Sequence, residues 1–203
     1  MNKHAALKTY FGYSGFRPGQ EGLIDALLAG RDALGVMPTG AGKSICYQLP
    51  AVLGQGVTLV VSPLISLMLD QVAALSTAGI PAAFINSALT AQQYRTVCDR
   101  AGAGAYKLIF IAPERLGSEG FLALCRRLPI DLVAVDEAHC VSQWGQDFRP
   151  SHLKIGEFIA QLPRRPAGGA FTATATEHVR ADIVRPLGPD NHLCLTTGLD
   201  RPN

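Results

Sequence analysis

Short, uninterrupted apolar runs recur along this chain, and they restrict its fold more than any other feature. The stretches TLVVS, LIFIA and LVAVD are apolar at almost every position, not at alternate positions. A strand with this pattern is buried on both faces, as in a parallel sheet that helices cover on each side. Longer segments of helical character separate the runs, so the sequence predicts a doubly wound α/β domain with right-handed crossovers.

The alternation predicts one mostly parallel central sheet with helices on both faces. Strands are expected at residues 33–37, 57–62, 82–86, 107–112, 131–136, 169–172 and 192–196. Helices are expected at residues 20–29, 43–53, 64–78, 91–100, 121–127, 151–161 and 177–186. Five polar motifs follow strand ends directly, namely MPTGAGKS, PLISL, APERL, DEAH and TATAT. Ligands of such sheets bind at the carboxyl ends of the strands, so we expect these motifs to share one rim.

The composition narrows the class of protein. The chain has 203 residues, of which 48% are hydrophobic and 17% charged, as in a single globular domain. The net charge of +2 gives no general basic coat, so any contact with nucleic acid must be local. The five cysteines include no C-x-x-C pair, which favours reduced thiols in a cytoplasmic protein and argues against structural zinc. Neither a signal-peptide pattern nor an apolar run of the ~20 residues that span a membrane is found.

The motif MPTGAGKS has the spacing of a phosphate-binding loop, with Met37 in place of the usual leading glycine. Glycines let backbone N–H groups turn toward an anion, and the following helix adds its positive end. Lys43 is predicted to contact the β- and γ-phosphates of ATP, and the Ser44 hydroxyl to bind Mg²⁺. The residues expected around the phosphates are Thr39, Gly40, Ala41, Gly42, Lys43 and Ser44. A glycine-rich turn that only caps a helix is the alternative.

Asp136 and Glu137 end the most apolar run of the second half of the chain. Adjacent residues at a strand end diverge, so the two carboxylates can serve different purposes. Asp136 is predicted to hold Mg²⁺ opposite Ser44, and Glu137 to orient and deprotonate an attacking water molecule. The alternative is a solvated acid pair that caps the next helix.

These motifs together resemble superfamily 2 helicases, and in detail they resemble the RecQ family of DNA helicases. FGYSGFRPGQEGLIDALLAGRD resembles the adenine-binding motif of that family, and VDEAHCVSQWGQDFRP resembles its acid motif joined to an aromatic-rich loop. DRPN resembles the end of its first motor domain, and the resemblance covers residues 10–203. It implies a single RecA-like P-loop NTPase domain over residues 1–203, with the adenine-binding motif within 1–30 and a linker starting at 197–203.

The resemblance implies how the adenine is bound. Tyr13 and Arg17 would sandwich the base between a ring and a guanidinium plane, and Gln20 would hydrogen-bond its edge. The alternative for Tyr13, together with Phe16, is a hydrophobic clamp on the first helix.

The resemblance also implies a site for single-stranded DNA. Trp144 and Phe148 would stack on bases beside the acid motif, although Trp144 could instead pack into the core. Ser62 would touch DNA phosphate or, equally, cap a helix. His139 would hydrogen-bond within the hydroxyl network of Thr172 and Thr174 and would not bind metal. The residues expected to bind DNA or to couple it to ATP are Ser62, Gln143, Trp144, Phe148, Arg149, Thr172 and Thr174.

The implied function is the ATP-binding motor domain of a 3′-to-5′ DNA helicase of repair and recombination. Its partners would be single-stranded or forked DNA and a second RecA-like domain that carries an arginine finger. The chain alone would be a monomer that binds ATP and Mg²⁺ without unwinding duplexes. Gln146 and Leu69 depart from the family, which commonly has histidine and lysine at these positions.

Three other functions remain open. An RNA helicase of the same superfamily would share the motifs, and a non-catalytic module could bind nucleotide without hydrolysing it. A P-loop kinase fits less well, because no lid or acceptor pattern is found and TATAT would be unexplained.

Overall fold

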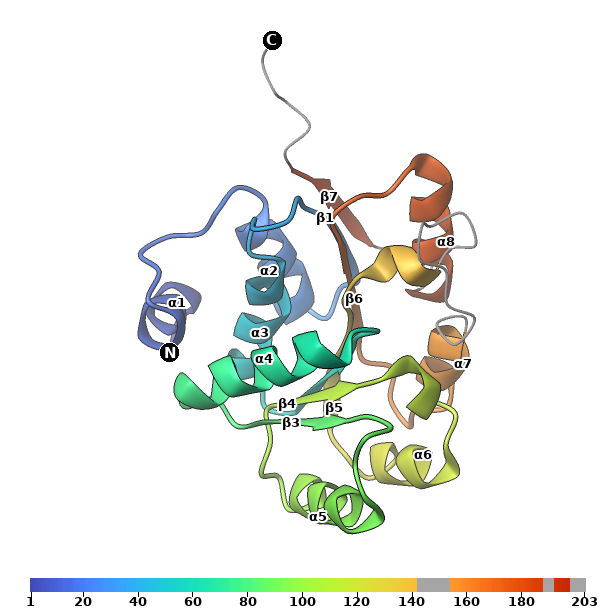
Figure 1. The fold of residues 1–203 in the computed structure, drawn as a ribbon. Helices are drawn as coiled ribbons and strands as arrows, with labels where there is room; N and C mark the ends of the chain where they lie inside the picture. The colour runs from blue at the N-terminus through green and yellow to red at the C-terminus, as the bar shows by residue number, and fades with distance from the viewer. Residues whose placement is uncertain (142–153, 188–191, 198–203) are drawn as a thin grey trace.

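The structure is a computed structural model that describes residues 1–141, 154–187 and 192–197 (Figure 1). Seven strands form one sheet in the order β3-β4-β2-β5-β6-β1-β7, and every pairing is parallel. The strands are β1 (Ala33–Val36), β2 (Val57–Val61), β3 (Ala82–Ile85), β4 (Leu108–Ile111), β5 (Ile130–Val135), β6 (Ala167–Thr172) and β7 (Leu193–Thr196). The predicted α/β fold is confirmed, and the ends of the strands differ from expectation by only one or two residues.

Helices join the strands and also precede the sheet. They are α1 (Lys3–Phe11), α2 (Gln20–Leu28), α3 (Lys43–Leu53), α4 (Ile65–Thr77), α5 (Ala91–Gly102), α6 (Glu119–Cys125), α7 (Lys154–Ala160) and α8 (Glu177–Leu187). Two short 3-10 helices follow β4 and β5, namely η1 (Pro113–Arg115) and η2 (Ala138–Val141). No helix among the described residues has the length and apolar character needed to cross a membrane.

The helix α1 was not predicted, because its sequence has little amphipathic pattern and only Ala6 and Leu7 are buried. Local capping helps to define it. The Asn2 side chain accepts a hydrogen bond of 2.8 Å from the Ala5 N–H, and Gly12 ends the helix in the left-handed conformation.

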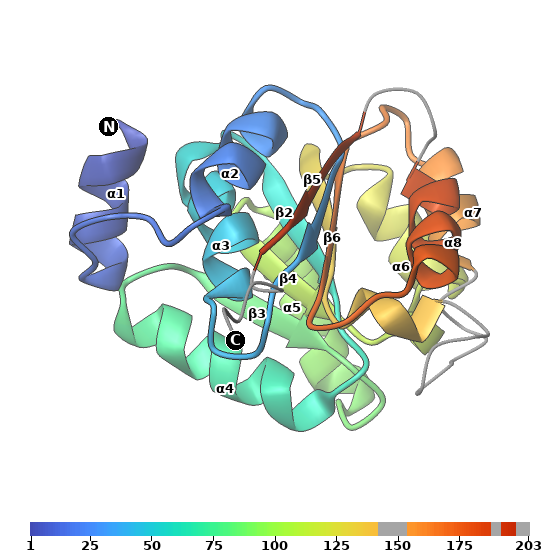
Figure 2. The ribbon, with the colours of Figure 1, turned by 90° about the horizontal axis from the view of Figure 1, so that it is seen from above.

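Helices cover both faces of the sheet (Figures 1 and 2). The helices α2, α3 and α4 pack on one face, and α5, α6, α7 and α8 pack on the other. The helix α1 lies outside this arrangement and buries Leu7 against Ile24 and Leu49 of α2 and α3. The phosphate-loop helix α3 therefore sits between the sheet and a further layer of chain.

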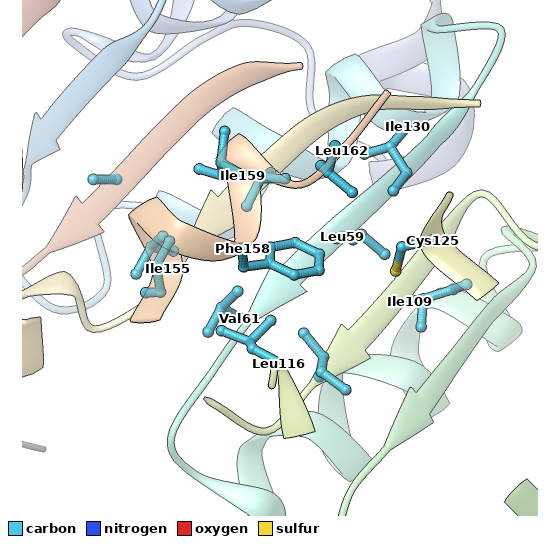
Figure 3. Packing of buried hydrophobic residues seen from close by; sticks show 14 of the residues in the cluster. Leu59, Val61, Ile109, Leu116, Cys125, Ile130, Ile155, Phe158, Ile159 and Leu162 are labelled. Carbon is cyan, nitrogen blue, oxygen red and sulfur yellow. The ribbon is translucent and has the colours of Figure 1, made fainter. Parts of the chain in front are cut away.

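The core on the α7 face is built from aromatic and branched side chains. Figure 3 shows the Phe158 ring pointing from α7 into a cluster that includes Leu59 and Val61 of β2. The rings of Phe158 and Phe121 stack with their centroids 5.9 Å apart, which joins α7 to α6. Each such buried side chain contributes about 1.5–3 kcal/mol. This packing fixes the sheet that carries the polar motifs.

The polar motifs meet at the carboxyl ends of adjacent strands, as predicted. The strands β2, β5, β6 and β1 are consecutive neighbours in the sheet. The Met37 N–H donates to the Thr172 carbonyl at 2.9 Å, and the Asp136 N–H donates to the Val61 carbonyl at 2.9 Å. The ladders thus extend past the strand ends and hold the phosphate loop, the acid motif and TATAT on one rim.

Candidate nucleotide site at the sheet rim

The phosphate loop has a conformation that requires glycine at two positions. Gly40 and Gly42 both have φ of +81°, in the left-handed region. A Cβ atom at Gly42 would also lie 2.5 Å from Gln20 Nε2, so a side chain there would displace the Gln20 amide as well as strain the backbone. Gly42 is the N-cap of α3 and provides no side-chain cap, which leaves the first N–H groups of the helix for an anion.

Lys43 and Ser44 begin α3 and are held by different partners. Lys43 Nζ donates to the Met37 carbonyl at 3.3 Å, so the lysine folds back over the loop. Ser44 Oγ accepts a hydrogen bond of 3.1 Å from Gln71 Nε2 of α4. Gln71 Oε1 in turn accepts from Gln48 Nε2 at 2.5 Å. The helices α3 and α4 are therefore linked through the hydroxyl that is the candidate metal ligand.

Sequence reasoning missed this glutamine pair. Gln48 lies four residues after Ser44, on the same face of α3, so the spacing offered a weak signal for its position. Gln71 lies on another helix, 27 residues from Ser44, and a spacing of that length does not predict a contact between the two side chains.

The two acids of the DEAH motif lie in different surroundings. Asp136 is only 5% exposed, and burial raises its pKa to about 6. The Glu137 charge is the second cause of this net rise in pKa. Three groups oppose it, namely the Glu137 N–H, which donates to Asp136 Oδ1 at 3.0 Å, the Lys43 charge and the Tyr47 hydroxyl. The Glu137 side chain is 24% exposed. One carboxylate is thus enclosed and the other is open to solvent, as separate roles require.

Glu137 has an unusual backbone. Its φ of 48° is the only left-handed value at a non-glycine position within residues 1–141, 154–187 and 192–197. Such strained positions cluster at functional sites, where the surrounding structure enforces them. The turn redirects the chain immediately after Asp136, which separates the two carboxylates.

His139 joins the acid motif to TATAT. Its Nδ1 lies 3.0 Å from Thr172 Oγ1 and 3.4 Å from Glu137 Oε2. The single hydroxyl hydrogen of Thr172 goes to the Thr174 carbonyl, at 3.0 Å, so His139 Nδ1 is the donor to Thr172. The expected hydrogen bonding of His139 within the Thr172 and Thr174 network is confirmed.

The predicted adenine-binding motif closes on the phosphate loop. Gln20 is buried, and its Nε2 donates to the carbonyls of Ala41 at 3.2 Å and Gly42 at 3.0 Å. Gln20 Oε1 accepts from the Arg17 N–H at 2.8 Å, and the Arg17 guanidinium donates to the Gly40 carbonyl. These contacts place the end of the motif directly beside the glycines.

Of the aromatic residues Tyr13 and Phe16 in this motif, one packs against the core and the other is exposed. Phe16 packs beside the cluster under α1, with its ring 5.0 Å from that of His4. Tyr13 is 48% exposed. A cavity of about 510 Å³ opens between α1, α3 and α4, with Tyr13, Ser44 and Gln48 in its wall. The alternative of a hydrophobic clamp on the first helix therefore fits Phe16. The Tyr13 ring instead lines a space large enough for a nucleoside.

Oxygen donors on the rim suit a magnesium ion. The Ser44 hydroxyl and the Asp136 carboxylate are hard ligands of the kind that Mg²⁺ takes together with substrate phosphates and water. In the described part of the chain, no group of three or more His, Cys, Asp or Glu side chains is placed to hold a metal ion.

The predicted DNA-contact residues fall into two groups. Thr172 is buried in the His139 network, Thr174 is exposed, and Ser62 is 1% exposed. Ser62 does not cap α4, whose N-cap is Leu64 without a side-chain cap. The remaining residues lie outside the described part of the chain, namely Gln143, Trp144, Phe148 and Arg149, together with Gln146.

Comparisons with known proteins show the family to which the chain belongs. The DEAD/DEAH box helicase family model matches residues 17–182. The ATP-dependent DNA helicase RecQ of Haemophilus influenzae is 46% identical over 199 residues, which are 98% of this chain and 32% of that protein. The ATP-dependent DNA helicase RecQ of Bacillus subtilis is 48% identical over 198 residues, which are 97% of this chain and 34% of that protein.

A solved structure shows the same fold. The hypothetical ATP-dependent RNA helicase from Sulfolobus tokodaii superposes with a TM-score of 0.72 at 21% identity, over 96% of this chain and 57% of that one. The chain spans about a third of the length of the RecQ relatives named above. The chain therefore belongs to the DEAD/DEAH box helicase family, as a domain of the RecQ type.

Proposed function

We propose that this chain is the ATP-binding motor domain of a DNA helicase, in which ATP hydrolysis drives movement along single-stranded DNA and the unwinding of duplexes. The proposal rests on one observation above all. The phosphate loop and the acid pair, which lie about 90 residues apart in the sequence, occupy one rim of the sheet, where Lys43 is close enough to lower the pKa of Asp136. A binding module without catalysis would not need a second, solvent-accessible carboxylate beside the buried one.

The roles of the rim residues follow from their surroundings. Lys43 and the backbone of residues 39–44 would hold the phosphates, and Tyr13, Arg17 and Gln20 would bind the adenine. Ser44 and Asp136 would hold Mg²⁺, which neutralises phosphate charge when it is bound. Glu137 would orient the attacking water and accept its proton, since its carboxylate is open to solvent.

DNA would act on this site through the acid motif. Trp144 and Phe148 would stack on bases, and Gln143, Arg149 and Ser62 would also contact the DNA. The hydrogen bond from His139 to Thr172 and the close approach of His139 to Glu137 provide a route by which a change beyond η2 could move the catalytic acid. The helicase of DNA repair and recombination that we propose includes a second motor domain, so this chain alone would bind ATP and hydrolyse it slowly.

Nucleotide binding tests the proposal directly. We expect the chain to bind a fluorescent ATP analogue in the presence of Mg²⁺, and Lys43→Ala to weaken that binding at least tenfold. Lys154→Ala is the matched control, because this exposed lysine lies on α7, across the sheet from the phosphate loop. Equal affinities of wild type and Lys43→Ala would contradict the proposal.

The nucleic acid is identified in a longer protein that contains the second motor domain. DNA should stimulate its ATP turnover more than RNA does, and Trp144→Ala should reduce this stimulation while leaving ATP binding intact. Greater stimulation by RNA would favour an RNA helicase.

A further inference from the structure

Two hydroxyl groups are buried beside the acid motif without a hydrogen-bond partner. Among the residues that the structure describes, few buried side-chain nitrogen or oxygen atoms lack a hydrogen-bond partner, and Tyr47 Oη and Ser62 Oγ are two of them. Tyr47 is fully buried on α3, and Ser62 directly follows β2. The pairing of Val61 with Val135 brings Ser62 next to Asp136.

The Tyr47 hydroxyl points toward the candidate metal ligands. Tyr47 lies three residues after Ser44, on the same face of α3. Its ring packs against Phe171 of β6, with the centroids 5.5 Å apart, which directs the side chain into the sheet. The Tyr47 hydroxyl lies near enough to Asp136 and Ser44 for hydrogen bonding with them to affect the pKa of Tyr47 and of Asp136, yet neither contact has the geometry of a normal hydrogen bond.

An unpartnered hydroxyl in such a position costs folding stability, whereas phenylalanine would fill the same space without this cost. Packing therefore accounts for the ring and not for the oxygen. A partner that becomes available only when the site binds its ligand would account for it. Asp136 is an anionic acceptor close to this hydroxyl, and one of its oxygens already accepts from the Glu137 N–H.

We propose that Tyr47 is a positioning residue of the nucleotide site, whose hydroxyl donates to the Asp136 carboxylate in the magnesium–nucleotide complex and holds it opposite Ser44. This inference rests on the proposed function. In this role Tyr47 contacts neither the nucleotide nor the attacking water. It acts only by holding the metal ligand Asp136 in position. The bond forms through a small movement of side chains that are already close to one another.

Tyr47→Phe tests the inference through binding and stability. The variant should unfold at the same temperature as the wild type or higher without ligand. Its affinity for a fluorescent ATP analogue should fall about tenfold in saturating Mg²⁺, the effect of losing a charge-assisted hydrogen bond, and should be unchanged in EDTA. Tyr94→Phe on α5, on the opposite face, is the matched control and should change neither affinity.

The outcomes separate this inference from the proposed function. If the wild type binds with Mg²⁺ and Tyr47→Phe binds equally well, the positioning role is wrong and the proposed function stands. If Tyr47→Phe is less stable without ligand and loses affinity equally with and without Mg²⁺, Tyr47 has only a packing role. If the wild type shows no Mg²⁺-dependent binding, both proposals are wrong.

Discussion

Replacing Asp136 with asparagine should stabilise the ligand-free protein while abolishing its binding of Mg²⁺ with ATP. The carboxylate is enclosed, and burial raises its pKa from 3.8 to about 6. Folding therefore takes up a proton on this group, so its contribution to stability is complete below pH 3.8 and is lost as the pH rises through about 6. Asparagine has nearly the same shape, never ionises, and can still accept the hydrogen bond from the Glu137 N–H.

The size of the effect follows from the two pKa values. The rise from 3.8 to about 6 corresponds to about 3 kcal/mol of unfolding free energy at pH 8, where the wild-type carboxyl is ionised. For a domain of this size that is a gain of about 6–12 °C in the melting temperature. At pH 5 the gain should be about half as large, because the folded wild type is then mostly protonated at this position.

Urea denaturation at pH 8, 6.5 and 5 measures the difference between wild type and Asp136→Asn. Asp70→Asn, an exposed acid on α4, is the control and should alter stability little at any of these values. ATP with Mg²⁺ should stabilise the wild type and leave Asp136→Asn unchanged. A variant that is less stable than the wild type at pH 8, or a gain that does not change with pH, would refute the reasoning.

Two further changes test the chemistry and the fold. Glu137→Gln should reduce ATP turnover at least a hundredfold in single-turnover assays and leave Mg²⁺–ATP affinity nearly unchanged, because a general base contributes about 10²–10⁴-fold to rate; a variant with wild-type turnover would show that Glu137 is not the base. Gly56→Ala should lower the unfolding free energy by several kcal/mol, since the new Cβ would overlap the Pro129 carbonyl oxygen and approach Asp131 Cγ to 2.7 Å. Gly102→Ala at the end of α5 is the control, where no atom lies within 4 Å and urea denaturation should show no loss; equal stability of the two glycine variants would contradict the packing at Gly56.

The sheet and its rim were predictable because their signals are local in the sequence. Each buried parallel strand is a continuous apolar run, and each motif follows its strand directly, so Lys43 and Asp136 had to meet once the sheet formed. The hydrogen bond of Gln71 to Ser44 and the position of Tyr47 near the acid motif depend on how the helices approach one another and the sheet. No spacing along the chain encodes those approaches.

The helix α1 could not be predicted from the sequence for a similar reason. It buries few side chains, and its contacts lie on α2 and α3, not on the sheet. Its apolar pattern is weak as a result, and only its caps at Asn2 and Gly12 identify its ends.

The most direct measurement is a crystal structure with a non-hydrolysable ATP analogue and Mn²⁺ in place of Mg²⁺, in which anomalous scattering locates the metal. We expect one metal peak between Ser44 and Asp136, with the terminal phosphate beside Lys43 and Glu137. A nucleotide bound away from the phosphate loop, or a metal bound without Ser44 and Asp136, would contradict it.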